Sequence, residues 1–210
     1  MKIDLICPLG FDAKYTQKRC FSRQFTKWVK LRFFEKTGKL LDIGCGMGNY
    51  LDDFKQLGYD VYGIDIDKNN IKLCKEKKLN VKICDMETEK LPFPNNFFDF
   101  VFSKHVIEHI DNTENFLSEI KRVLKPNGIT FIMTENWDKT HKNFFIKDIT
   151  HKKPFTLDSF KQALLKNNFN IVTIKNFRNM PIIWRYFVIA FDPVFIKSRD
   201  MFVLAKKKSS

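Results

Sequence analysis

Three glycines at alternate positions, Gly44, Gly46 and Gly48, lie between a short apolar run and a helical pattern. Glycine gives up the most conformational entropy on folding, so such a cluster marks a backbone that bends sharply or approaches a ligand closely. A strand that leads through a glycine-rich turn into a helix commonly binds nucleotide-like ligands, because free N–H groups at the helix start point at the ligand. The segment therefore predicts a site for a nucleotide-like ligand.

The spacing of the glycines disfavours a dinucleotide. In the dinucleotide fingerprint the third glycine lies three residues after the second, whereas Asn49 occupies that position here. Asp42 lies two residues before the first glycine, and its carboxylate would be close to the place where a pyrophosphate binds. A ligand with cationic groups fits this segment better.

The string D-I-G-C-G-M-G, residues 42–48, resembles motif I of the class I S-adenosylmethionine-dependent methyltransferases. The resemblance covers about residues 38 to 175. It includes LPFPNNFFDFVFSKHVIEHIDN and VLKPNGITFIM, which look like the subset that methylates small molecules, quinones, lipids and sugars (the methyltransferase domain 11 type). It implies S-adenosylmethionine as the methyl donor and S-adenosylhomocysteine as the product.

The resemblance also assigns roles to residues beyond the glycines. Asp65 would hold both ribose hydroxyls, for which an acceptor-only carboxylate is suited, and Asp85 would lie near the adenine amino group. Met86 would supply a backbone contact and an apolar wall, while Asp42 would orient the loop through structure or water. The expected cofactor-binding residues are Asp42, Gly44, Cys45, Gly46, Gly48, Asp65, Ile66, Asp85, Met86 and Ser103, together with Tyr15 and Arg19 from the N-terminal segment.

Two histidines are candidate catalytic bases. His105 follows the fourth expected strand, whose carboxyl end faces the donor methyl group in the family, and an imidazole titrates near neutral pH. His151 follows the fifth strand, in a region that lines the acceptor pocket in related enzymes. The alternative interpretation is a loop histidine that caps a neighbouring element. His109 is expected to pack against the sheet.

The string H-x-x-E-H, residues 105–109, superficially suggests a metal site of the inverted zincin type. We expect no metal there, because the ion would lie beside the methyl donor and the same string recurs in methyltransferases that use no metal.

From Lys39 onward, apolar runs alternate with amphipathic stretches. This alternation predicts right-handed crossovers and a mostly parallel sheet with helices on both faces. After residue 156 one helix is followed by two strand-like runs, which predicts an antiparallel pair at the sheet edge. The expected fold is α/β, a Rossmann-like seven-stranded sheet with an antiparallel C-terminal strand pair. Strands are predicted at 39–44, 60–66, 80–85, 98–103, 129–135, 170–177 and 199–208, and helices at 21–36, 50–58, 69–79, 111–128 and 156–169.

The chain of 210 residues fits one domain. Residues 1–38 are expected to form a helical cap or lid, and residues 39–210 a single methyltransferase domain. The five cysteines are odd in number and never occur as C-x-x-C, which fits neither a zinc site nor a disulfide framework and indicates a reducing cytosol.

The net charge of +13 invites a nucleic-acid partner, but the cations are spread along the chain, so such a partner is not favoured. The apolar stretch 180–196 contains Arg185, Asp192 and Pro193 and is too short and too charged to span a bilayer. We expect a cytoplasmic protein. Residues 180–196 are expected either to be buried in the core or at a dimer contact, or to contact a membrane surface peripherally.

The sequence thus predicts an enzyme that transfers a methyl group from S-adenosylmethionine to an oxygen or nitrogen of a small-molecule, sugar or lipid-like acceptor. Two alternatives stay open. An RNA methyltransferase is favoured by charge, although base-amino methyltransferases carry N-P-P-[YF] after the fourth strand, where this chain has Ser103, Lys104 and His105. The second alternative is a non-catalytic module that binds S-adenosylmethionine.

Overall fold

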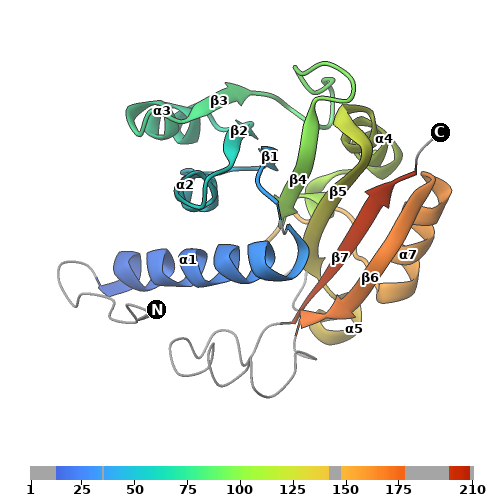
Figure 1. Cartoon of the computed structure of the whole chain (residues 1–210). Helices are drawn as coiled ribbons and strands as arrows, with labels where there is room; N and C mark the ends of the chain where they lie inside the picture. Colours follow the sequence, from blue (N-terminus) through green and yellow to red (C-terminus); the bar gives the residue numbers. More distant parts are fainter. Residues whose placement is uncertain (1–12, 35, 142–147, 178–198, 209–210) are drawn as a thin grey trace.

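The computed structural model describes residues 13–34, 36–141, 148–177 and 199–208, with side chains from Ser22 onward. Strands and helices alternate along most of this chain, as Figure 1 shows. The elements are α1 (Ala13–Phe33), β1 (Lys39–Ile43), α2 (Asn49–Gln56), β2 (Asp60–Asp65), α3 (Lys68–Glu76), β3 (Asn80–Ile83), β4 (Phe98–Lys104), the 3-10 turn η1 (Ile107–His109), α4 (Thr113–Val123), β5 (Leu124–Glu135), α5 (Trp137–Thr140), α7 (Leu157–Lys166), β6 (Phe169–Asn176) and β7 (Asp200–Lys207).

The seven strands form one sheet in the order β3-β2-β1-β4-β5-β7-β6. The first five of these strands are parallel to one another, and β7 runs antiparallel to both β5 and β6. This arrangement confirms the predicted Rossmann-like sheet with its antiparallel C-terminal pair. The carboxyl ends of β1, β2, β4 and β5 therefore meet at one edge of the sheet, together with the start of β7.

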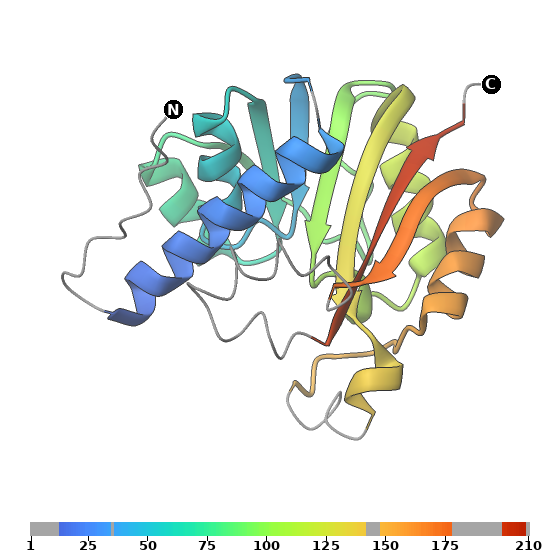
Figure 2. The same cartoon turned by 60° about the horizontal axis from the view of Figure 1, so that its bottom comes forward.

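Alternation of side chains along the strands gives the sheet two hydrophobic cores. On one face, Phe102 and Phe131 belong to a cluster with buried residues of α1, α2 and α3. On the other face, Val101 and Ile132 belong to a cluster with buried residues of α4 and α7. Figure 2 shows α1 crossing the first face and α7 lying beyond the opposite side of the strands.

Helix α1 packs onto the sheet, as predicted for residues 21–36. Phe25, Trp28 and Val29 are all buried, and the Trp28 ring contacts the Phe202 ring of β7 edge-on at a centroid distance of 5.6 Å. Burial of each such side chain is worth about 1.5–3 kcal/mol. The packing joins the N-terminal helix to strands that lie more than 150 residues later in the chain.

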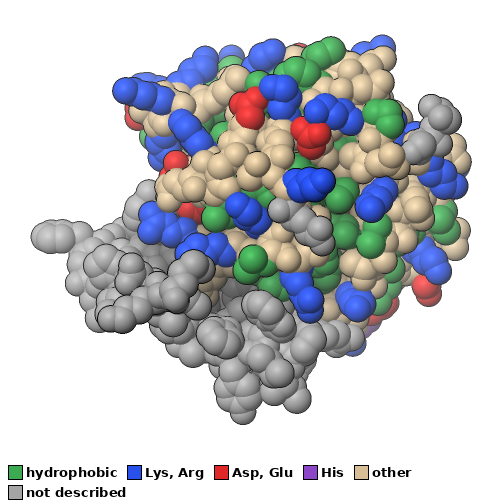
Figure 3. All heavy atoms as spheres, in the orientation of Figure 1, with side chains coloured by type: hydrophobic (Ala, Val, Ile, Leu, Met, Phe, Trp, Pro, Cys, Tyr) green, Lys and Arg blue, Asp and Glu red, His purple; other side chains and the backbone are tan. Residues whose placement is uncertain are grey.

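Basic side chains cover the face of the molecule shown in Figure 3, spread among neutral and hydrophobic groups rather than gathered in one stripe. No helix in the described part of the chain is long and apolar enough to cross a membrane. The apolar stretch 180–196 lies outside the described residues.

Candidate cofactor and acceptor site

The glycine segment forms a tight loop between β1 and α2. Gly44, Gly46 and Gly48 have φ angles of 72°, 52° and 76°, a left-handed region that glycine enters without the steric cost other residues pay. The amides of Gly44 and Cys45 both donate to the Ile64 carbonyl at 2.9 Å. These two bonds hold the start of the loop against the end of β2.

The three glycines serve different purposes. A β-carbon at Gly44 would lie 2.3 Å from a methyl carbon of Val106, and one at Gly48 would lie 2.8 Å from the Cys74 sulfur. A β-carbon at Gly46 would meet no described atom within 4 Å. Packing thus requires Gly44 and Gly48, whereas the backbone at Gly46 is open to an approaching ligand.

Asp65 is fixed at the end of β2, beside this open backbone. One carboxylate oxygen accepts a hydrogen bond from the Gly46 amide at 2.7 Å, and the other accepts from the Asp67 amide at 2.9 Å. The side chain of Ile66, the next residue, is 64% exposed. An anchored acceptor-only carboxylate next to an exposed apolar side chain suits a ribose with its attached base.

Asp42 lies inside the protein beneath the loop, with 2% of its surface exposed. Its Oδ2 atom has no hydrogen-bond partner among the described residues. Burial, followed by the charge of Asp65, raises the pKa of Asp42 well above its ordinary value. Burying a carboxyl group without a hydrogen-bond partner lowers the stability of the fold. A role of Asp42 in ligand binding would explain why the protein has such a group.

The remaining predicted cofactor residues differ in their hydrogen bonding and in their exposure. Asp85 caps a turn, because its carboxylate accepts hydrogen bonds from the Glu87 amide at 2.9 Å and the Thr88 hydroxyl at 3.1 Å. The side chains of Cys45, Met86 and Ser103 are buried. Met86 is 5% exposed as a whole residue, and its predicted backbone contact and apolar wall at the adenine stay predictions.

Tyr15 and Arg19 lie on α1, and their side chains are outside the described part of the structure. Their predicted contacts with the donor stay predictions.

His105 follows β4 directly and has a left-handed backbone, with φ of 55°. Its Nδ1 atom lies 2.9 Å from a carboxylate oxygen of Glu108, and its Nε2 atom lies 3.5 Å from a carboxylate oxygen of Asp200. The other oxygen of Glu108 accepts a hydrogen bond from the Thr134 hydroxyl at 2.8 Å. Residues from β4, η1, β5 and β7 thus meet at the carboxyl edge of the parallel strands.

Two opposing influences set the pKa of His105. Burial and the neighbouring Lys104 charge lower it, while hydrogen bonds to Asp200 and Glu108 and the Asp200 charge raise it to about 9. A histidine with that pKa is protonated at neutral pH and lacks the lone pair that a general base uses. The predicted base role of His105 is therefore disfavoured at neutral pH.

His151 and His109 lie together, with ring centroids 4.8 Å apart. The Nδ1 atom of His109 lies 3.0 Å from the Thr150 hydroxyl. His109 therefore contacts the 148–151 turn, and its packing against the sheet stays a prediction. The base role of His151 stays a prediction.

Ligand-type atoms of Glu108, His109 and His151 lie within 4.8 Å of one another. Because both carboxylate oxygens of Glu108 already contact Thr134 and His105, we assign no metal ligand to these residues. The expectation that the protein uses no metal stays a prediction.

Lys104 and Asp200 belong to this site and were not singled out from the sequence. The Lys104 ammonium lies 6.0 Å from the centroid of the Tyr50 ring on α2, and burial lowers its pKa despite the nearby charges of Asp200, Glu108 and Glu135. Asp200 pairs with Glu135 in the antiparallel register of β5 and β7. The sequence signal available for Asp200 was the predicted antiparallel final strand. A strand that runs antiparallel to its neighbour must begin at the edge where the parallel strands end.

Comparisons with known proteins agree with this geometry. Residues 41–132 match a family described as "Methyltransferase domain". The chain is 36% identical over 115 residues to a ubiquinone biosynthesis O-methyltransferase of Pelagibacter ubique, covering 52% of this chain and 46% of that protein. It is 32% identical over 115 residues to sterol 4-C-methyltransferase strm-1 of Caenorhabditis elegans, covering 50% of this chain and 34% of that protein.

The fold is also similar to that of a crystal structure described as a SAM dependent methyltransferase from Archaeoglobus fulgidus. The TM-score is 0.67 and the sequence identity 26%, over 93% of this chain and all of that one. The chain spans less than half of either of these two curated relatives.

The matched segment identifies residues 41–132 as a methyltransferase domain, and the sheet order and glycine loop are those of the class I S-adenosylmethionine-dependent methyltransferases. Family and fold imply S-adenosylmethionine as the cofactor, as predicted from the sequence.

Proposed function

We propose that this chain transfers a methyl group from S-adenosylmethionine to an oxygen or nitrogen of a small-molecule, sugar or lipid-like acceptor. The observation that supports the proposal best is the Gly46 backbone, which is open on its outer side and bonded to the Asp65 carboxylate. The relatives named for ubiquinone and sterol chemistry support an acceptor with lipid-like character.

The residues present fit this cofactor. Asp65 would hold the ribose diol, the backbone at Gly46 would admit the amino-acid end, and Asp42 would face its cationic groups from below. When bound, the cofactor supplies a sulfonium methyl group that an acceptor lone pair attacks, and the electrons of the broken carbon–sulfur bond stay on sulfur. The protein's contribution to such a displacement is positioning and exclusion of water.

The acceptor would bind beside the carboxyl ends of β4 and β5, where Lys104, His105 and Asp200 lie. Ligands of open α/β sheets bind outside the carboxyl ends of the strands. We also propose residues 39–210 as the methyltransferase domain, with the N-terminal segment as its cap. A cytoplasmic location with peripheral membrane contact stays a prediction.

Calorimetry with S-adenosylmethionine tests the cofactor site. The substitution Asp65→Asn should weaken binding about 10- to 100-fold, because charge-assisted hydrogen bonds contribute about 1.5–3 kcal/mol. Asp60→Asn is the matched control. Asp60 begins the same strand at the opposite edge of the sheet and pairs with Lys39 at 2.7 Å, so its replacement should leave the affinity unchanged.

The transfer itself is tested with methyl-labelled donor and separated extracts of metabolites, lipids and RNA. Label in the metabolite or lipid fraction supports the proposal, and label in RNA supports the nucleic-acid alternative. Binding of the donor without label in any fraction would support the non-catalytic module instead.

A further inference from the structure

We propose that His105 acts as a fixed cation that binds the ionised oxygen of the acceptor, in the place that the Asp200 carboxylate occupies in this structure. The inference rests on the proposed function and narrows its acceptor class. It assigns the acceptor an acidic hydroxyl group, such as that of a phenol or an enol, rather than an aliphatic alcohol or an amine.

The first step concerns the charge of the ring. Both ring nitrogens of His105 face carboxylate oxygens, at 2.9 Å for Glu108 and 3.5 Å for Asp200. A carboxylate only accepts hydrogen bonds, so each nitrogen must carry a proton to interact favourably. The geometry therefore holds an imidazolium.

The two carboxylates are held unequally. The Glu108 side chain is fully buried, and its second oxygen is bonded to Thr134, so this contact is fixed. The Asp200 side chain is 18% exposed, and its distance of 3.5 Å exceeds that of a normal charge-assisted hydrogen bond. The Asp200 side of the ring is the side that another anion can take over.

The backbone keeps the ring in place. His105 has φ of 55°, a conformation that is strained for a non-glycine residue and persists only when surrounding contacts enforce it. The His105 amide donates to the Met133 carbonyl of β5 at 2.9 Å. The next residue, Val106, packs directly over Gly44 of the cofactor loop, so the imidazolium lies close to the donor site.

Charged groups surround the ring on several elements: Lys104 of β4, Glu108 of η1, Asp200 of β7 and, near Lys104, Glu135 of β5. The pKa of His105 is about 9 as the balance of these influences and of burial. An acceptor oxyanion at Nε2 would replace the Asp200 charge with its own, so the ring would stay protonated when the acceptor binds.

A fixed cation selects among nucleophiles. It stabilises an oxyanion and so lowers the pKa of an acidic hydroxyl group, which can then bind already ionised. The oxyanion forms a bond to the methyl carbon as the carbon–sulfur pair remains on sulfur, and both product groups are neutral. An amine must be uncharged to attack and gains no such stabilisation from the ring.

Histidine titration by NMR tests the ion pair without any turnover. The chain has four histidines, and His105→Asn assigns the signal, because asparagine tolerates a positive φ. We expect His105 to titrate near pH 9 in the wild-type chain and at least one pH unit lower in Asp200→Asn. The control Asp99→Asn removes a carboxylate paired with Lys125 at 2.8 Å and should leave the titration unchanged.

The acceptor class is tested with 4-nitrophenol, whose ionised form has its own visible absorbance, in the presence of S-adenosylhomocysteine. In the wild-type chain the bound phenol should ionise at least one pH unit below the free phenol, a tenfold preference for the anion. His105→Asn should abolish this shift, and the methyl ether 4-nitroanisole should show no comparable affinity.

A His105 titration at or below pH 6.5, no binding of the phenol, or an equal shift in His105→Asn would overturn the inference. Calorimetry with S-adenosylhomocysteine on the same samples separates the two proposals. A chain that fails to bind this product refutes the proposed function, whereas a chain that binds it and fails the histidine or phenol tests refutes only the role of His105.

Discussion

At the scale of single residues, two buried aspartates on neighbouring elements have opposite expected effects on the stability of the fold. Asp53 of α2 accepts a hydrogen bond from the Ser22 hydroxyl at 2.5 Å and lies 3.7 Å from the Arg23 guanidinium. Asp42 of β1 is equally buried, but its Oδ2 atom has no partner in the described chain. The first carboxyl stabilises the fold, and the second weakens it.

We therefore expect Asp42→Asn to stabilise the protein by about 1–3 kcal/mol at pH 7 while weakening cofactor binding. Because burial raises the pKa of Asp42, the folded state binds this proton more tightly than the unfolded state. Its ionisation therefore costs stability as pH rises above the ordinary range of the group. Urea unfolding at pH 5 and pH 7 should show a larger gain at pH 7 for the variant.

Asp53→Asn provides the contrast, since it removes a carboxylate that has partners. It should destabilise the protein by about 1–2 kcal/mol. A loss of stability in both variants would show that Asp42 is satisfied in the folded protein and would remove the stability cost attributed to it.

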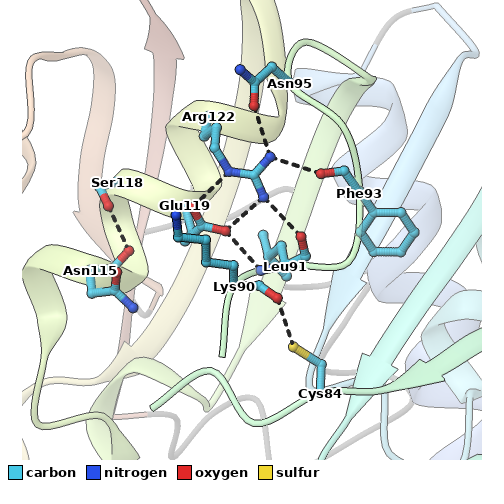
Figure 4. Close-up of polar contacts among 9 residues, drawn as sticks. All are labelled: Cys84, Lys90, Leu91, Phe93, Asn95, Asn115, Ser118, Glu119 and Arg122. Atoms are coloured by element: carbon cyan, nitrogen blue, oxygen red, sulfur yellow. Dashed lines mark hydrogen bonds and ion pairs between the residues drawn. The ribbon is translucent and has the colours of Figure 1, made fainter. Parts of the chain in front are cut away.

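At the scale of elements, Arg122 at the end of α4 ties down the loop between β3 and β4, as Figure 4 shows. Its guanidinium donates to Glu119 at 2.7 Å and to the carbonyls of Leu91 and Phe93 at 2.9 and 2.8 Å. Glu119, 5% exposed, in turn accepts from the Leu91 amide at 2.8 Å. Since Asp85 lies at the start of this loop, the clamp would also support the adenine contact that is proposed for Asp85.

We expect Arg122→Met to destabilise the protein by about 2–3 kcal/mol, because it leaves a buried carboxylate without its cation. Lys125→Met removes the more exposed pair with Asp99 and should cost less than about 1 kcal/mol. Hydrogen exchange should increase at the Leu91 and Asn96 amides only in the first variant. Equal losses in the two variants would contradict a structural role for the clamp.

Local signals predicted the elements well. Asp67 and Asn112 directly precede two of the helices and accept hydrogen bonds from the amides of Asn69 and Asn115, which is the usual role of these residue types at a helix start. Contacts between distant segments were not visible in the same way. Arg122 reads as a basic residue in a last helical turn, and its partners Leu91 and Phe93 lie 31 and 29 residues earlier.

The residues of the site also differ in whether a local stretch of sequence or a contact between distant segments brings them together. The glycine loop and Asp65 lie within one strand–helix–strand unit, so the resemblance to the family could assign both from a short stretch of sequence. Asp200 reaches His105 only because β7 inserts antiparallel between β5 and β6. Its contact with His105 depends on the order of strands in the assembled sheet, of which the predicted antiparallel final strand was only a partial signal.

At the scale of the whole molecule, the strong positive charge calls for an explanation separate from the site. The net charge is +13, yet basic side chains are spread over the face in Figure 3. Several basic side chains of the described chain also pair with acids. Lys39 pairs with Asp60, and Lys125 pairs with Asp99. A dispersed charge attracts polyanions without specifying a binding geometry.

We therefore expect weak RNA binding that disappears as salt is added. A fluorescently labelled 20-nucleotide RNA should bind at 20 mM salt and lose at least about 100-fold in affinity by 200 mM, because its attraction is purely counterion-driven. Fluorescence anisotropy measures this loss. The affinity for S-adenosylmethionine should change little over the same range, since the contacts expected from Asp65 and the glycine loop are short hydrogen bonds rather than long-range charge.

A single-stranded DNA of the same sequence is the control and should bind equally, because phosphate attraction does not read the sugar. Preference for RNA that survives 200 mM salt would instead require stacking or base contacts at a defined surface. That result would contradict a small-molecule acceptor as the sole substrate class, because the charge would then serve recognition. If RNA and DNA lose affinity together, the positive charge is a bulk property of the surface, and the acceptor is selected at the carboxyl edge of the sheet.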